Sequence, residues 1–373
     1  MNLLLQNHTN LVPRRSGVNF ILLGRNQRPY INPMIEPSTS KPEQSRAVLP
    51  LEPGTVIFWF VVLVFVLLVV LGISLVVGSY PVSLADVWAW ASGHGDSTLN
   101  QIMGEVRAPR VFLTVFVGAC LGLAGPLLQS GFRTSLADPY LLGLAGFAAL
   151  NAVLGQVGGY AGFGTPVLGV LGALEATFLV TRLSQDTSSE RRALVGVSFA
   201  SISVAGLALL LALGSSPSSA NVIGWVVGGF YAQGTPQLNA LLPIALPAIV
   251  IAFLVGRAAN LVQLGDDVSE NLGLNARVAR NGLIFLAAVL TGVAVGTSGL
   301  LGFVGLIAAG LARAILGTDY RRLLPAACLI GAIAVSLSDL LGRTLLSPNE
   351  IPAGAFTTIV GGVYLIFLSR RAQ

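Results

Sequence analysis

Long apolar runs alternate with short polar connections from about residue 56 to the end of the chain. A helix that crosses the hydrocarbon of a bilayer needs about 20 predominantly apolar residues. The pattern therefore predicts an all-α, polytopic membrane protein with about ten transmembrane helices. Their expected limits are 56–78, 111–130, 141–158, 167–183, 193–213, 238–256, 282–298, 300–316, 325–342 and 353–369.

Glycine recurs at four-residue spacing inside two of the predicted spans. Gly118 with Gly122, and Gly292 with Gly296, form pairs of small residues on one helix face. Such pairs let two membrane helices approach closely, so we expect them to mark packing contacts.

The first 54 residues have a different composition from the rest of the chain. They carry seven prolines and most of the polar residues of the first hundred. We expect a polar, proline-rich N-terminal tail over 1–54 that is disordered, followed by a transmembrane domain over 55–373.

Composition supports a membrane protein and argues against a soluble enzyme. Hydrophobic residues make up 54% of the chain and charged residues 10%, whereas a soluble domain has about a quarter charged residues. Cys120 and Cys328 fall inside apolar runs and are interpreted as small hydrophobic residues. With two histidines in the chain and its one lysine, Lys41, outside any phosphate-binding loop, we expect no catalytic residue, metal site or cofactor here.

The distribution of Lys and Arg predicts the orientation in the membrane. If the N-terminus is cytoplasmic and the spans alternate, 18 of the 21 basic residues fall inside, and the C-terminus is also cytoplasmic. The three exceptions, Arg107, Arg110 and Arg343, lie at the ends of the external loops 79–110 and 343–352. They could dock carboxylates of an external partner, or pair locally with Glu105, Asp339 or Glu350, and the residues alone leave both interpretations open.

The longest cytoplasmic connection, 257–281, contains an apolar stripe at helical spacing with acidic residues beside it. Gly273 is placed to end this helix. The acidic middle favours a protein partner over a lipid surface, because surface-bound helices usually carry Lys and Arg. The stripe consists of Leu261, Leu264, Val268 and Leu272, and the acidic residues are Asp266, Asp267 and Glu270.

The cytoplasmic loop 182–192 carries three small polar residues, Thr187, Ser188 and Ser189. They would suit a narrow constriction at the inner end of a pathway, although an ordinary solvated loop has the same composition. Inside the bilayer the ionisable groups are few, chiefly Glu175 and Asp339, which argues weakly against an ion-coupled carrier.

Several motifs in order resemble the permease subunits of ABC importers for iron–siderophore, heme and cobalamin. The resemblance is collinear from about residue 56 to the C-terminus. The motifs are RAPRVF at 107–112, GACLGLAGPLLQ at 118–129, LADPYLLGLAG at 136–146, WVVGGF at 225–230, LGDDVSENLGL at 264–274, GLLGFVGLI at 299–307, DYRRLLP at 319–325, SDLLGR at 338–343 and EIPAG at 350–354.

The resemblance implies a type II ABC importer permease fold, with two ten-helix subunits, most simply a homodimer, in the plasma (inner) membrane. It implies a pathway between the subunits, separate ATPase subunits that carry ATP-Mg, and an external substrate-binding protein. It also implies that the three external arginines dock the binding protein and that residues 266–275 couple to the ATPase. The inner gate would correspond to Thr187–Ser189, and the cargo would be a metal chelate, either iron–siderophore, heme or cobalamin.

This chain departs from the family pattern in three places. Ala308, Ala309 and Gly310 replace the usual Pro-His, Thr134-Ser135 replaces Asn-Pro, and Gly361–Leu365 replaces a GAPFF sequence. The first change leaves docking intact but puts detailed gating in question. Three alternatives remain. The loss of Pro-His suggests a degenerate subunit that does not transport. The others are a stand-alone secondary carrier or channel, and pairing with a non-identical permease.

Overall fold

The computed structural model describes residues 52–78, 82–158, 164–183, 189–213, 224–231, 233–346 and 349–371. The expected tail lies almost entirely outside the described residues, so its disorder and the boundary at 54/55 stay predictions. The residues from Pro50 onward form one compact unit.

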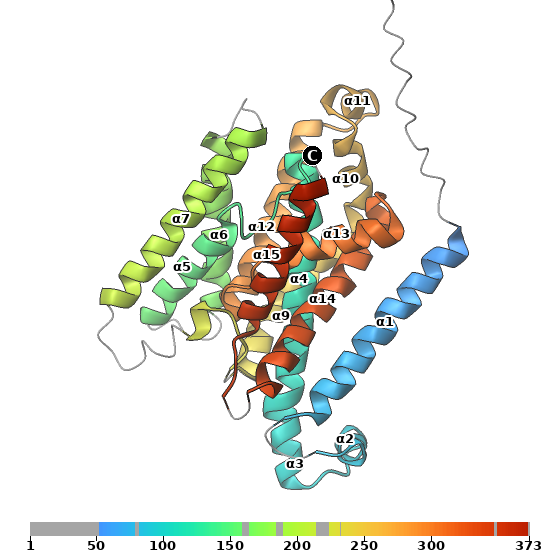
Figure 1. Ribbon diagram of the computed structural model, residues 1–373, viewed down its shortest axis with the longest axis vertical. Coiled ribbons are helices and arrows are strands. Elements are labelled where there is room, and N and C mark those ends of the chain that lie inside the picture. Colours follow the sequence, from blue (N-terminus) through green and yellow to red (C-terminus); the bar gives the residue numbers. More distant parts are fainter. Residues whose placement is uncertain are drawn as a thin grey trace, which may run out of the picture. The chain divides into compact units, whose positions relative to one another are not determined.

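Every regular element among the described residues is helical, which confirms the all-α prediction (Figure 1). The helices are α1 (Pro53–Val76), α2 (Leu84–Ala91), α3 (Ser97–Gln101), the π-helical turn η1 (Ile102–Arg107), α4 (Ala108–Phe132), α5 (Leu144–Val157), α6 (Gly164–Leu183), α7 (Ser189–Leu213), α9 (Thr235–Leu254), α10 (Gly256–Gln263), α11 (Asp266–Asn271), α12 (Ala276–Ser298), α13 (Val304–Leu316), α14 (Tyr320–Thr344) and α15 (Ala353–Arg371).

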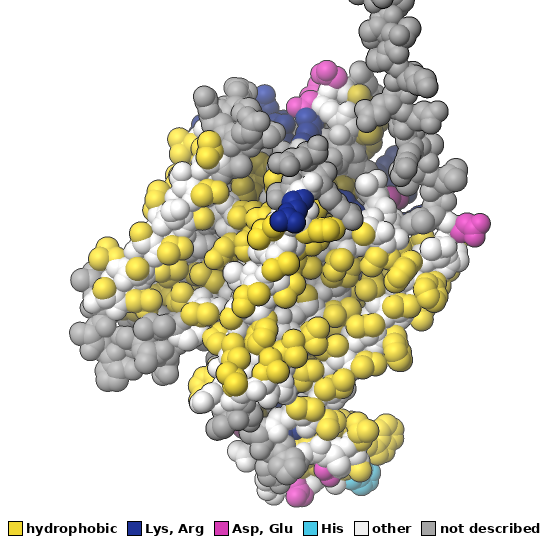
Figure 2. Space-filling model, in the orientation of Figure 1, with side chains coloured by type: hydrophobic (Ala, Val, Ile, Leu, Met, Phe, Trp, Pro, Cys, Tyr) yellow, Lys and Arg dark blue, Asp and Glu magenta, His cyan; other side chains and the backbone are white. Residues whose placement is uncertain are grey.

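Within this unit, seven described helices or continuous helical segments are long and apolar enough to cross a membrane, and three shorter apolar helices accompany them. Together they correspond to the ten predicted spans. Apolar side chains cover the middle of the visible face, and charged side chains gather toward two opposite ends (Figure 2). We call these the α2 end, which carries α2 and α3, and the α11 end, which carries α10 and α11.

The second span is much longer than its apolar run, which corrects the expected helix start. A continuous helical segment covers Ser97–Phe132, so Arg107 and Arg110 lie within it and not at the end of a loop. The turn η1 precedes Pro109, which has no N–H and crowds the carbonyl four residues earlier. A π-helical turn widens the backbone there, and the N–H of Ala108 donates to the carbonyl of Met103, five residues back.

Two short helices, α5 and α13, are each preceded by partly buried non-helical chain. Helices of 14 and 13 residues reach only about 20 Å, less than the hydrocarbon thickness. Residues 133–143 lead into α5, and residues 299–303 lead into α13. Asp138, which is 1% exposed, ties the first of these segments to the first turn of α13, because its carboxylate accepts the N–H groups of Tyr140 and Leu306, at 2.8 and 2.9 Å. Such irregular backbone is tolerated in a membrane protein where protein surrounds it.

The predicted glycine pairs do mark close helix contacts. A Cβ on Gly118 would lie 2.4 Å from the carbonyl oxygen of Gly331, so α4 and α14 touch backbone to backbone. A Cβ on Gly292 would lie 2.6 Å from the carbonyl oxygen of Gly169, and α12 meets α6 in the same way. These contacts place α4 in the centre of the bundle and hold α14 against it.

Candidate functional site

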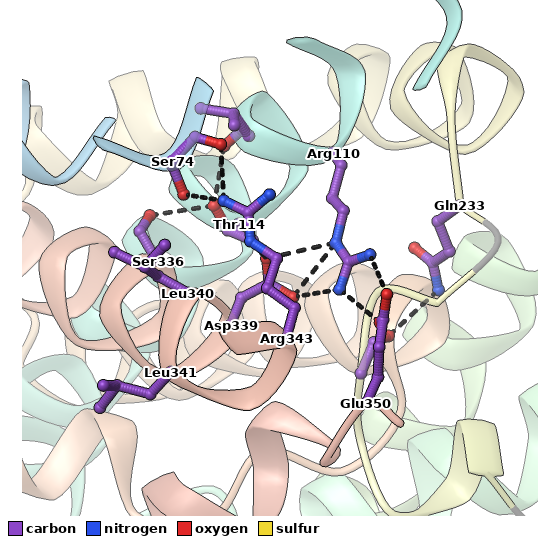
Figure 3. Close-up of polar contacts among 12 residues, drawn as sticks. Ser74, Arg110, Thr114, Gln233, Ser336, Asp339, Leu340, Leu341, Arg343 and Glu350 are labelled. Atoms are coloured by element: carbon purple, nitrogen blue, oxygen red, sulfur yellow. Dashed lines mark hydrogen bonds and ion pairs between the residues drawn. The ribbon is translucent and has the colours of Figure 1, made fainter. Parts of the chain in front are cut away.

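Two of the three arginines that the sequence set apart, Arg110 of α4 and Arg343 of α14, meet at Asp339 at the α2 end, and Glu350 also binds Arg110 (Figure 3). The third, Arg107 of η1, binds the same turn of α1 as Arg343. We call this set the outer cluster, which consists of Arg107, Arg110, Arg343, Asp339 and Glu350.

Arg110 is the centre of the outer cluster and binds both carboxylates. Its guanidinium donates to Asp339 from Nε and Nη2, the shortest bond being 2.8 Å, and to both oxygens of Glu350, at 3.2 and 2.8 Å. Its side chain is 13% exposed, so this fork-to-carboxylate geometry is largely shielded from water. Arg110 thereby joins α4 to α14 and to the segment that leads into α15.

Arg107 and Arg343 both bind the last turn of α1. Arg107 donates from Nη1 to the carbonyl oxygens of Leu75 and Val76, at 2.8 and 3.1 Å. Arg343 donates from Nη2 to the carbonyl and hydroxyl oxygens of Ser74, both at 2.6 Å. The last carbonyls of a helix lack partners within the helix and carry partial negative charge, so two guanidinium groups there stabilise the end of α1.

The outer cluster is mostly internal in this conformation. Arg107 is 6% exposed, and the side chain of Arg343 is 8% exposed. The predicted local pairing of Arg343 with Asp339 is present at 3.8 Å, while Glu350 pairs with Arg110. With three guanidinium groups and two carboxylates, the outer cluster has a net charge of +1. Docking of an external partner on these arginines stays a prediction.

At the α11 end, the predicted single helix is two helices. Leu264 ends α10, and Gly265, with φ +104°, turns the chain before α11 begins at Asp266. A φ in this range suits glycine and interrupts helical hydrogen bonding. The prediction that Gly273 ends the helix is confirmed, since its φ is +81° and its N–H donates to the carbonyl of Glu270.

Polar bonds hold α10 and α11 firmly on the bundle. Ser269 is fully buried and donates to the carbonyls of Leu261 and Gly265, both at 2.6 Å. Asp266 accepts from Arg133 at the end of α4 and from Arg280 of α12. Partial burial acts to raise the pKa of the Asp266 carboxyl, but the bonds and charges of Arg133 and Arg280 hold it below its usual value.

The break redirects the apolar stripe but does not bury it. Leu264, Val268 and Leu272 are 58%, 45% and 60% exposed, whereas Leu261 is half-buried. Asp267 and Glu270 are exposed beside them. We call Leu264, Val268 and Leu272 the exposed stripe. It is an apolar surface beside acidic side chains, on helices that the bonds of Ser269 and Asp266 join to each other and to the bundle.

The expected gate falls on the part of the chain that the structure leaves undescribed. Thr187 and Ser188 lie outside the described residues, and Ser189 is described only as the first residue of α7. Where the family has Pro-His, α13 runs without interruption and packs on α15. A Cβ on Gly310 would lie 1.7 Å from the hydroxyl oxygen of Tyr364, so a larger residue there would require this tyrosine side chain to move.

Sequence reasoning missed the residues that position the α11 end. In the sequence Arg133 and Arg280 are only two of the 18 basic residues assigned to the cytoplasmic side. An arginine directly after a membrane span, 133 residues from an acidic turn, gives no local signal that the two will meet. The one available hint was Ser269, a small polar residue inside an amphipathic segment.

The described helices form a multi-pass membrane bundle with a largely buried charge cluster at one end and an exposed apolar and acidic surface at the other. The chain belongs to the FecCD transport family, whose model matches residues 66–371.

Relatives and a solved structure agree with this assignment. The hemin transport system permease protein HmuU of Yersinia pestis is 33% identical over 83% of this chain and 94% of its own length. The vitamin B12 import system permease protein BtuC of Serratia proteamaculans is 31% identical over 82% of this chain and 92% of its own. A structure described as an inward-facing conformation of a metal-chelate type ABC transporter has a TM-score of 0.74 at 27% identity, covering 86% of this chain and all of the other.

Proposed function

We propose that this permease imports a metal chelate by ATP-driven alternating access, powered by separate ATPase subunits that carry ATP-Mg. The relatives named above transport hemin and vitamin B12, and a third, from Bacillus subtilis, is a probable siderophore transport permease at 32% identity. Iron–siderophore, heme and cobalamin are therefore the cargo classes to test. We place the protein in the plasma (inner) membrane with both termini in the cytoplasm, as a homodimer with the pathway between subunits.

The exposed stripe is the observation that carries the proposal. A membrane helix bundle without a phosphate-binding loop needs an energy source from outside the chain. The exposed stripe leaves three apolar side chains in water, flanked by Asp267 and Glu270, in the segment that matches the family's ATPase-coupling residues. An ATPase groove would cover it, and the polar bonds of Ser269 and Asp266 would transmit ATPase movement to α4 and α12.

Reconstitution of the full-length permease tests this function directly. Vesicles containing the permease and its ATPase, with the binding protein outside and ATP-Mg inside, should accumulate a ferric siderophore, hemin or cobalamin without any ion gradient. Uptake driven by a proton or sodium gradient without ATP would instead support a stand-alone carrier. No uptake under either condition, despite intact ATPase assembly, would support a subunit that does not transport.

We also propose that the outer cluster attracts the acidic surface of a binding protein. The outer cluster has a net charge of +1. The side chain of Glu350 is 27% exposed, so the cluster reaches the surface at the rim of the α2 end. The binding-protein carboxylates would compete with Asp339 and Glu350 for the arginines.

Replacing Glu350→Gln should accelerate association with the binding protein by roughly two- to fivefold at low salt. The change removes one negative charge and keeps the side-chain volume, so the cluster becomes more positive. Surface plasmon resonance with the permease in nanodiscs measures the association rate. The matched control is Glu52→Gln. Glu52 is an exposed carboxylate that precedes α1, at the opposite end of α1 from the turn that the outer cluster binds. An unchanged or slower rate for Glu350→Gln would mean that the outer cluster only holds helices together.

A further inference from the structure

A cavity of about 870 Å³ opens between α6 and α12 at the α11 end. The two helices touch at Gly169 and Gly292 and separate beyond this crossing toward Arg182 and Arg277. Gly131, near the end of α4, packs on Ile284 and closes one side. The cavity belongs neither to the outer cluster nor to the exposed stripe.

Three arginines and one carboxylate line the cavity. Arg277 makes no hydrogen bond or ion pair with any described residue, and the contact described for Arg182 is with the ring of Phe178, 5.4 Å from its centroid. Arg280 shares Asp266 with Arg133, at 3.3 Å for the Arg280 bond. The single carboxylate is thus already divided between two guanidinium groups, and the described lining carries net positive charge.

Polar and apolar groups follow the same order along both helices. On α6, Leu174 and Phe178 precede Arg182 toward the α11 end, and on α12, Ile284 and Phe285 lie deeper than Arg277. Eight residues separate Arg182 from Leu174 and Arg277 from Phe285, about 12 Å of helix. Phe178 and Phe285 are 58% and 55% exposed. The cavity therefore has a basic rim at the membrane surface and an aromatic wall inside the hydrocarbon.

We propose that this cavity is a binding site for an anionic phospholipid of the leaflet at the α11 end. Arginine binds phosphate through paired hydrogen bonds, and basic pockets between transmembrane helices suit acidic lipid head groups. The acyl chain covers the ring faces of Phe178 and Phe285. A soluble phosphate leaves that wall bare, and an ATPase approaching from the cytoplasm reaches the arginine rim but not Phe285, about 12 Å deeper than Arg277. Bound lipid ties α6 to α12 where their backbones have separated.

Native mass spectrometry of the full-length permease tests the site, with phosphatidylglycerol and cardiolipin as probes and phosphatidylcholine as the neutral comparison. The double substitution Arg182→Gln and Arg277→Gln should reduce retained anionic lipid about tenfold or more and leave phosphatidylcholine unchanged. The matched control, Arg257→Gln and Arg321→Gln, removes two exposed arginines at the same end but outside the cavity and should have little effect. Both Arg182 and Arg277 are exposed, so the folded state should tolerate the change.

Two further arms separate a lipid from other anions. Phe178→Ser with Phe285→Ser should weaken lipid retention although every arginine remains, and Arg277→Lys should restore most of the binding lost in Arg277→Gln. Equal lipid loss in the control pair would overturn the site, because general surface charge would then explain binding. Displacement of the lipid by millimolar inorganic phosphate, or no effect of the phenylalanine changes, would also overturn it in favour of a soluble anion. Retention unchanged in the Arg182 and Arg277 variant would exclude the cavity altogether.

Discussion

Replacing Leu264, Val268 and Leu272 together by serine is expected to release the ATPase from the permease and to abolish uptake. Each change removes about 1–2 kcal/mol of apolar burial at the proposed interface. The sum, about 3–6 kcal/mol, weakens the complex roughly 10²- to 10⁴-fold. The permease itself should fold normally, because all three side chains are exposed in the free subunit. Co-purification of the tagged permease with its ATPase, quantified as subunit stoichiometry, measures the effect.

A control with three serine substitutions at the same end separates this contact from general loss of apolar surface. Leu183, Leu194 and Val278 are 60%, 67% and 66% exposed and lie outside α10 and α11. Their replacement should leave the ATPase bound. Full ATPase stoichiometry in the Leu264, Val268 and Leu272 variant would place the exposed stripe against lipid or against the permease itself, and the coupling proposal would fail.

Removal of the Asp339 carboxylate, by Asp339→Ala, should destabilise the bundle by about 3–5 kcal/mol. Asp339 is 4% exposed and contacts both Arg110 and Arg343, so its loss leaves two buried guanidinium groups with only Glu350 to balance them. Thermal unfolding of the full-length protein in detergent, followed by size-exclusion chromatography, measures the change in Tm. The reason for the large effect is the uncompensated charge rather than the lost bonds alone.

Two companion variants make this prediction specific. Glu350→Gln removes a more exposed carboxylate from the same arginine and should lower Tm much less. Arg110→Met combined with Asp339→Leu removes charge of both signs and should recover part of the loss, since a buried ion pair replaced by apolar groups of similar size is often nearly neutral. A Tm for Asp339→Ala that matches the unmodified protein would show that water or lipid head groups already solvate the arginines.

The spans were predictable because a membrane helix needs a long apolar run, and such runs can be seen directly in the sequence. The irregular parts were not, because they depend on contacts between distant segments. Nothing near Arg107 indicates that its partners are backbone carbonyls of α1, and carbonyls have no sequence signature. Likewise Arg110 and Glu350 are 240 residues apart and meet only in the folded bundle.

Local conformational signals gave mixed results at the α11 end. The spacing of Leu261, Leu264, Val268 and Leu272 is helical throughout, yet Gly265 breaks the helix between them. Glycine is tolerated inside helices, so its presence alone does not decide the matter. Ser269 then fixes the break, since its hydroxyl donates to the carbonyl of Leu261 in α10 as well as to that of Gly265 and so ties α11 to α10.

The guanidinium groups of Arg107 and Arg343 fix α1 to the bundle at its last turn. The polar contacts described between α1 and the other helices all lie at this last turn. Only 11% of an apolar 18-residue stretch of α1 is buried within the protein. Lipid tails can solvate the remaining apolar side chains of α1 about as well as protein does. The attachment of α1 to the bundle therefore depends on the bonds at its last turn and on a few buried side chains such as Leu63.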